Sequence, residues 1–188
     1  MLNLRKALNL QLQLVTEIIY SLSPYFYKRY FTHWKIIPAN ELKYLQESFD
    51  LCTIKKVVLL GGGAIPYTAI FLNNIIKPEV FVIVEKNKIA YFAASRLLKK
   101  LNLTNLKVVN VSAEDYSTND NSLIIVALQA TGKQRIVETI LNESYNNILI
   151  IRQPLKKGKL VFESVSLNGW KYTTVKQKQD FESIVLTK

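Results

Sequence analysis

The stretch that decides the fold is Val57-Val58-Leu59-Leu60-Gly61-Gly62-Gly63-Ala64-Ile65-Pro66-Tyr67-Thr68-Ala69-Ile70. Four apolar residues are followed by three glycines, and Pro66 then opens a run with apolar residues at helical spacing. This order predicts a buried parallel strand, a tight turn and the start of a helix. Glycines let the backbone pass close to a ligand, and the free N–H groups at a helix start favour an anionic or hydrogen-bonding group. The stretch therefore predicts a nucleotide-type ligand at the end of this strand.

A second buried strand, Val80 to Val84, strengthens this interpretation because it ends in Glu85. The dinucleotide fingerprint G-x-G-x-x-G is only partly met, since Gly61 and Gly63 are in place but Pro66 stands at the third glycine. An acidic residue at the tip of the second strand accepts hydrogen bonds from ribose hydroxyls in dinucleotide and S-adenosylmethionine sites alike. The alternative is a connecting turn followed by a solvated glutamate.

Composition restricts the class of protein. The 188 residues predict one domain, or one domain with a small appendage, and a hydrophobic content of 49% excludes disorder. A single cysteine, Cys52, allows no intrachain disulfide and favours a reducing, cytoplasmic setting. Residues 57–76 are uncharged and long enough for a membrane span, but the glycines, Pro66 and two asparagines argue against one. We expect no export signal and no membrane partner.

The net charge of +11, from 25 basic against 14 acidic residues, is compatible with nucleic acid, an acidic membrane surface or anionic small substrates. The lysines are scattered, and the sequence contains no RNA-binding motif or long basic tract. A solvated basic surface is therefore favoured, with RNA binding as the alternative.

The N-terminal region predicts helices followed by an aromatic patch. Residues 4–22 carry apolar side chains at three- and four-residue spacing, which indicates an amphipathic helix that ends at Ser23-Pro24. The rings between Tyr25 and Trp34 either fix these helices to the main domain or form a wall over the nucleotide. His33 lacks partners for a metal site, and no metal is expected. A further helix is predicted to begin at Asn40 as N-cap, with Glu41 in its first turn, where a negative charge suits the helix dipole.

The remaining chain alternates strands and helices. Polar residues follow each predicted strand and would face one crevice: Glu114 and Asp115 after the strand at 106–111, Gln129 after 122–128 and Arg152 after 147–151. An acidic residue after the strand at 106–111, the third strand of the chain, could accept from an adenine amine. Beyond Pro154, short alternating stretches at 160–166, 170–175 and 181–187 predict two closing strands in an antiparallel hairpin. We expect an α/β, Rossmann-like, seven-stranded S-adenosylmethionine-dependent methyltransferase fold, with a helical cap at 1–52 and a binding domain at 53–188.

These motifs resemble those of nicotianamine synthases. Residues 61–68 are similar to the family's loop Gly-Ser-Gly-Pro-Leu-Pro-Leu-Thr, and residues 24–30 resemble its segment Phe-Pro-Tyr-Tyr-Asn-Asn-Tyr. Residues 40–45 resemble its following Leu-Glu-Phe helix, and the fourth and fifth strands match in order and approximate spacing, so the resemblance spans about residues 24–188. Ala64 and Tyr67 depart from the loop pattern, and the family usually carries a longer helical N-terminal domain.

The resemblance implies a transfer reaction. In this chemistry an amine attacks the γ-carbon of S-adenosylmethionine, takes its 3-amino-3-carboxypropyl group and releases methylthioadenosine. The resemblance assigns Glu41 as acceptor of the nucleophile's proton and Tyr67 as its partner. The implied donor contacts are Gly61, Gly62, Gly63, Thr68, Glu85, Leu128 and either Glu114 or Asp115, and the implied acceptor contacts are Tyr27, Tyr30, Gln129 and Arg152. The partner would be a small amine or amino acid, and a homodimer is compatible with the sequence.

Two other functions stay open. One is a methyltransferase acting on RNA or a small molecule, with Gln129 near the methyl group. The other is a non-catalytic adenosine- or RNA-binding module. Glu41 discriminates among them, because neither alternative needs a carboxylate at that helix facing the donor. The sequence leaves open the acceptor amine and the number of transfer cycles.

Overall fold

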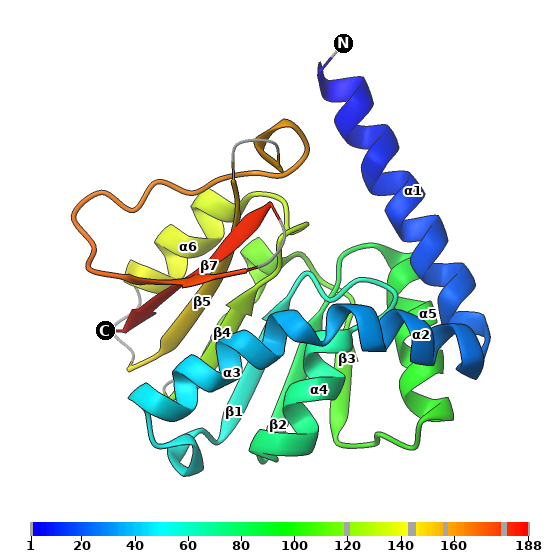
Figure 1. Cartoon of the computed structure of the whole chain (residues 1–188), viewed down its shortest axis with the longest axis horizontal. Helices are drawn as coiled ribbons and strands as arrows, with labels where there is room; N and C mark the ends of the chain where they lie inside the picture. The colour runs from blue at the N-terminus through cyan, green and yellow to red at the C-terminus, as the bar shows by residue number, and fades with distance from the viewer. Residues whose placement is uncertain (1, 119–120, 143–145, 156–157, 178–179, 188) are drawn as a thin grey trace.

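The computed structural model describes residues 2–118, 121–142, 146–155, 158–177 and 180–187, which form one sheet flanked by helices (Figure 1). In chain order the elements are α1 (Leu2–Leu22), α2 (Pro24–Trp34), α3 (Ile36–Ser48), the 3₁₀ helix η1 (Leu51–Thr53), β1 (Lys56–Leu60), α4 (Tyr67–Ile76), β2 (Val80–Val84), α5 (Lys88–Lys100), β3 (Leu106–Val109), η2 (Ala113–Asp115), β4 (Ser122–Val126), α6 (Lys133–Asn142), β5 (Ile148–Pro154), η3 (Gly158–Leu160), β6 (Thr173–Lys176) and β7 (Phe181–Thr187).

The sheet has seven strands in the order β3-β2-β1-β4-β5-β7-β6. The first five strands run parallel, and β7 lies antiparallel between β5 and β6. This confirms the predicted fold class and the antiparallel hairpin at the sheet edge. Of the three alternating stretches beyond Pro154, residues 161–166 form no strand. The predicted boundary at residue 52 falls within η1.

The strands are buried on both faces, as a continuous apolar pattern requires of a parallel sheet. Alternate residues of each strand point to opposite faces. In β1, Val57 and Leu59 pack with α3, α4 and α5, whereas Val58 and Leu60 pack with α6. The central strand β4 has no exposed residue along its length. The sheet therefore provides a rigid base, and its carboxyl ends carry the loops described below.

Helix α3 differs from the prediction. It begins at Ile36, so Pro38 is its third residue, where the missing N–H has no intrahelical partner to lose. Asn40 and Glu41 consequently lie inside the helix, and the interpretation of Asn40 as an N-cap and of Glu41 as a first-turn carboxylate is wrong. Helix α4 similarly begins at Tyr67, with Pro66 as its N-cap rather than its first residue.

Helix α1 does not bury the apolar side that its sequence pattern predicts. Of its predicted apolar positions, Leu8, Leu12, Val15, Ile19 and Leu22 are between 52% and 56% exposed, and Ile18 is half-buried. Among the residues of α1 whose burial is described, the buried ones are polar: Glu17 is 3% exposed and Ser21 is 6% exposed. The C-terminal half of α1 lies against α5 and α2, and its N-terminal half stands away from the sheet (Figure 1). Among the described residues, no helix combines the length and apolarity that crossing a membrane demands.

Candidate functional site

Two adjoining cavities open at the carboxyl ends of the parallel strands. The smaller, of about 260 Å³, lies over the ends of β1 and β2 and is lined by Gly61, Gly63 and Glu85. The larger, of about 1330 Å³, lies between helices α1 to α3 and the ends of β4 and β5. Gln13, Glu17 and Gln129 line both cavities, so the two spaces meet at these side chains. This is the crevice in which open α/β sheets bind their ligands.

The glycine loop needs all three glycines. Gly61 and Gly63 have φ angles of +84° and +67°, a left-handed conformation that other residues adopt at a cost. Gly62 has no room for a side chain, because a Cβ there would overlap Ile83 of β2. The loop folds back on the second strand, where the N–H groups of Gly61 and Gly62 donate to the carbonyl oxygen of Val84 at 2.9 and 3.2 Å. The sequence pattern therefore produces a close backbone turn beside the small cavity.

Glu85 lies at the tip of β2, as predicted, and is 8% exposed. Its Oε2 accepts the N–H of Gly63 at 2.8 Å, and its Oε1 accepts the N–H of Asn87 at 2.7 Å. Asn87 in turn caps α5 by accepting the N–H groups of Ile89 and Ala90. The carboxylate is thus fixed against the glycine loop while its edge faces the cavity.

The acidic pair after β3, Glu114 and Asp115, does not line the small cavity. At the tip of β3 the small cavity is lined by Ser112 and Ala113 instead. Glu114 instead faces α6, where its Oε2 lies 3.4 Å from Nη1 of Arg135. Asp115 is not among the residues that line either cavity. The assignment of Glu114 or Asp115 to an adenine amine stays a prediction.

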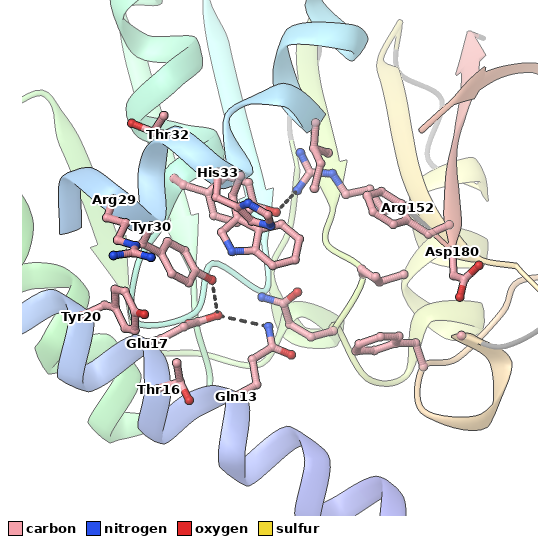
Figure 2. A pocket seen from close by; sticks show the side chains of 18 of the residues that line it. Gln13, Thr16, Glu17, Tyr20, Arg29, Tyr30, Thr32, His33, Arg152 and Asp180 are labelled. Atoms are coloured by element: carbon pink, nitrogen blue, oxygen red, sulfur yellow. Dashed lines mark hydrogen bonds between the residues drawn. The ribbon is translucent and has the colours of Figure 1, made fainter. Parts of the chain in front are cut away.

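Glu17 is the site residue that the sequence analysis missed. Its Oε2 accepts the N–H of Ala64 at 2.9 Å, and its Oε1 accepts the hydroxyl of Tyr30 and the amide of Gln13, each at 3.1 Å (Figure 2). Burial raises the pKa of this carboxyl above its usual value. One signal was available, because Glu17 is the only charged residue between Lys6 and Lys28.

The larger cavity brings together five of the predicted residues: Tyr30, Tyr67, Leu128, Gln129 and Arg152. Its roof is aromatic, with the ring centroid of Tyr67 lying 6.2 Å from those of both Tyr30 and Trp34. The rings thus both join α2 to the sheet domain and form a wall of the cavity, which combines the two interpretations of the aromatic patch. Burial is the main cause that raises the pKa values of the Tyr30 and Tyr67 hydroxyls, so both rings present neutral O–H groups.

A buried ion pair lies behind this wall. Nε and Nη2 of Arg152 each donate to one carboxylate oxygen of Glu41 at 2.8 Å, and the Ser183 hydroxyl donates to Oε1 at 2.6 Å. Glu41 is fully buried and does not line the cavity, whereas Arg152 does. The remaining nitrogen, Nη1, donates to the hydroxyl of Tyr67 at 3.3 Å (Figure 2). Arg152 therefore connects the Glu41 carboxylate to the Tyr67 hydroxyl at the cavity wall.

Three other predicted residues lie outside both linings. Gly62 packs against Ile83, and Thr68 is buried in the first turn of α4. Tyr27 packs against the core and the ring of Phe31, and burial raises its pKa to about 12. In the described part of the chain, no three His, Cys, Asp or Glu side chains are grouped so as to hold a metal ion.

Comparison with known proteins supplies a fold match. No protein-family model and no curated protein sequence matches the chain. The nicotianamine synthase MtNAS, solved in complex with MTA and tNA, matches with a TM-score of 0.76 at 17% identity. That match covers 100% of this chain and 75% of MtNAS. The chain has the fold of a nicotianamine synthase. The resemblance inferred from the glycine loop is therefore confirmed at the level of the fold.

Other matches place this fold within a wider class. A glutamate-to-glutamine mutant of MtNAS in complex with S-adenosylmethionine matches with a TM-score of 0.74 at 16% identity. That match covers 99% of this chain and 77% of the mutant chain. A putative methyltransferase, yhhF from Escherichia coli, matches 80% of this chain, and 84% of its own length is covered, with a TM-score of 0.61 at 9% identity. The architecture is that of S-adenosylmethionine-dependent transferases.

Proposed function

We propose that this protein is a nicotianamine synthase-like transferase, which moves the 3-amino-3-carboxypropyl group of S-adenosylmethionine to an amine. The proposal rests on the share of this chain that matches a nicotianamine synthase, compared with the share that matches a methyltransferase. The MtNAS fold covers all of it, including the helices that roof the large cavity, whereas the yhhF methyltransferase covers 80%. The complete match to MtNAS therefore favours aminocarboxypropyl transfer over methyl transfer.

The two cavities suit the two substrates. The donor's adenosine would lie in the small cavity, where Glu85 can accept from ribose hydroxyls, and its amino-acid arm would extend past Gly63 towards Glu17. The acceptor amine would occupy the larger cavity beside Tyr30, Tyr67 and Arg152. Substrates held on the two sides of this junction would lie next to each other, which lowers the entropic cost of a displacement between them.

The chemical step is a displacement at carbon. The lone pair of the amine forms a bond to the γ-carbon while the bond from that carbon to sulfur breaks, and sulfur keeps the electron pair as neutral methylthioadenosine. The amine nitrogen then loses one proton to a base. Because a sulfonium is a good leaving group, the protein mainly aligns the amine and keeps it unprotonated.

The role of Glu41 is refined by its position. Its carboxylate oxygens already accept from Arg152 and Ser183, behind the cavity wall. We therefore assign Glu41 as a positioning residue that fixes Arg152 and, through it, the Tyr67 hydroxyl. Proton acceptance by Glu41, as the resemblance implies, requires the amine to reach the carboxylate behind Arg152.

The product tests the reaction class. Purified protein is incubated with S-adenosylmethionine and a panel of α-amino acids and polyamines, and the nucleoside product is identified by mass. Methylthioadenosine that appears only when an amine is present supports the proposal. S-adenosylhomocysteine would instead show the methyltransferase, and donor binding without either product would show a non-catalytic module.

Variants test the residues. Glu41→Gln should retain donor affinity, because the adenosyl contacts lie elsewhere, and should slow methylthioadenosine release by roughly 10²–10⁴-fold if it removes general-base help. Tyr67→Phe should show a smaller loss in the same direction. If Glu41 only positions Arg152, Glu41→Gln should slow methylthioadenosine release about as much as Tyr67→Phe does, and the pH dependence of the rate should be unchanged. Unchanged methylthioadenosine release in Glu41→Gln would mean that Glu41 neither accepts the proton nor positions Arg152 for the reaction.

A further inference from the structure

Glu17 occupies the junction of the two cavities but has no role in the reaction assigned above. It reaches the glycine loop from α1, a helix that otherwise lies apart from the sheet (Figure 1). A Cβ on Gly63 would lie only 2.6 Å from Oε2 of Glu17, so the absence of a side chain at Gly63 makes room for this carboxylate. The loop and the helix residue therefore fit one another closely.

Two carboxylates fill the hydrogen-bonding positions that a glycine loop usually offers to a ligand anion. Glu85 accepts from the N–H of Gly63 at 2.8 Å, and Glu17 accepts from the next N–H, that of Ala64, at 2.9 Å. A phosphate or a free carboxylate would meet two negative groups here instead of free donors. The loop of this protein is consequently a poor anion site, in contrast to glycine loops that hold pyrophosphate.

In the described part of the chain, Glu17 is held by neutral groups. Its hydrogen-bond donors are the backbone N–H groups of Ala64 and Ile65, a tyrosine hydroxyl and a glutamine amide. No ion pair to Glu17 occurs among the described residues. A buried carboxylate without a cation is costly, and a ligand that brings a positive charge removes that cost. The structure thus offers a cation-binding position beside an adenosine-sized pocket.

We propose that Glu17 is a donor-binding residue that accepts a hydrogen bond from the α-ammonium group of S-adenosylmethionine. This rests on the proposed function, since it concerns the same donor. An ammonium group is favoured over the sulfonium as the direct contact, because only the ammonium has N–H donors for the carboxylate. Glu17 and Glu85 together select the cationic amino-acid arm and reject phosphorylated nucleosides.

Three ligands separate the contributions when their affinities are measured by calorimetry without an acceptor amine. S-adenosylmethionine and S-adenosylhomocysteine carry the ammonium, and methylthioadenosine does not. Glu17→Gln should weaken the first two by about 10- to 100-fold, the range for a hydrogen bond between charged groups. Methylthioadenosine should bind as to the wild type, which also shows that the variant is folded. The acceptor amine is left out because it could itself supply an ammonium group to Glu17.

Two control variants complete the experiment. Glu85→Gln should weaken all three ligands alike, because each contains the ribose. Tyr30→Phe removes a hydrogen bond to Glu17 but keeps its charge, so the affinity ratio of S-adenosylmethionine to methylthioadenosine should be preserved.

Several outcomes would overturn the inference. An equal loss of all three ligands in Glu17→Gln would show a structural role, and unchanged affinities would show no role. Loss of S-adenosylmethionine alone would assign Glu17 to the sulfonium instead of the ammonium. Failure of the wild type to bind either S-adenosylmethionine or methylthioadenosine would contradict the proposed function itself.

Discussion

The central sheet and helix α1 bury opposite kinds of residue. In β1 and β4, apolar side chains are buried on both faces, and the burial follows hydrophobicity. In α1, Leu8, Leu12, Val15, Ile19 and Leu22 are exposed, while Glu17 and Ser21 are buried. Burial in the sheet stabilises the fold, whereas burial in α1 places a carboxylate at the junction of the two cavities. The contrast separates residues that are buried for packing from a residue that we propose is buried for binding.

Glu41 of α3 and Glu17 of α1 are both buried carboxylates, and they are held differently. Glu41 has a bidentate partner in Arg152 of β5. Among the described residues, the groups that donate to Glu17 are neutral. Removing the charge of Glu41 should therefore destabilise the protein, whereas removing the charge of Glu17 should stabilise it.

The largest effect is expected at Glu41. Glu41→Ala leaves the buried guanidinium of Arg152 without its partner, which should lower the free energy of unfolding by about 3–5 kcal/mol. Urea denaturation measures this loss. The double variant Glu41→Leu with Arg152→Met removes both charges and should regain most of the stability. If the double variant is no more stable than Glu41→Ala, the loss does not arise from an unpaired charge.

A core substitution in the sheet should come next. Ile125 lies in β4 and is fully buried, so Ile125→Ala removes apolar contacts and leaves a cavity. We expect the free energy of unfolding to fall by about 2–5 kcal/mol. Ile19→Ala is the matched control, because Ile19 is 53% exposed on α1. Similar losses for the two variants would contradict the contrast between the sheet and α1.

Hydrophobic patterning was a reliable guide where burial stabilises the fold. The five parallel strands and the closing hairpin were predicted because buried strands read as continuous apolar runs bounded by turn residues. The same reasoning located Gly61, Gly63 and Glu85, since the carboxyl ends of parallel strands meet at one edge. Arg152 was located at the tip of the fifth strand, Tyr67 was drawn from the resemblance, and the topology places the two together.

The parts that were not predicted depend on tertiary contacts. The start of α3 was misplaced because Asn40 and Glu41 imitate an N-cap, whereas Asn40 contacts Gln177 and Glu41 pairs with Arg152, both distant in the chain. Glu17 was missed because a lone acid in an apolar helix resembles a solvated position. Its burial follows from the N–H of Ala64, a partner 47 residues away.

A smaller effect, of opposite sign, is expected at Glu17. The pKa of this carboxyl is raised in the folded protein, so folding favours its protonated form. Stability from this group is present below the unfolded pKa and is lost as the pH rises from that value through the folded pKa. At pH 7 the isosteric Glu17→Gln should therefore raise the free energy of unfolding by about 0.5–2 kcal/mol.

The pH dependence distinguishes this effect from repacking. Thermal melts of Glu17→Gln and the wild type, recorded without ligand between pH 7 and the usual glutamate range, should converge as the pH falls. A gain in stability that is the same at every pH would mean that desolvation of the charge is not its cause. A loss of stability at pH 7 would contradict the prediction outright.

The smallest effect is expected on the exposed side of α1. Leu12 and Ile19 are both more than half exposed, so changing both to glutamine removes little buried apolar surface. The free energy of unfolding should stay within about 0.5 kcal/mol of the wild type, as for other surface substitutions. Urea denaturation at two protein concentrations, with sedimentation of both proteins, provides the measurement.

If the wild type is instead more stable at the higher concentration and the variant is not, a second copy covers this side of α1, because only association makes stability depend on concentration. The apolar residues of α1 would then follow the same burial rule as the sheet, with their packing partner in another chain.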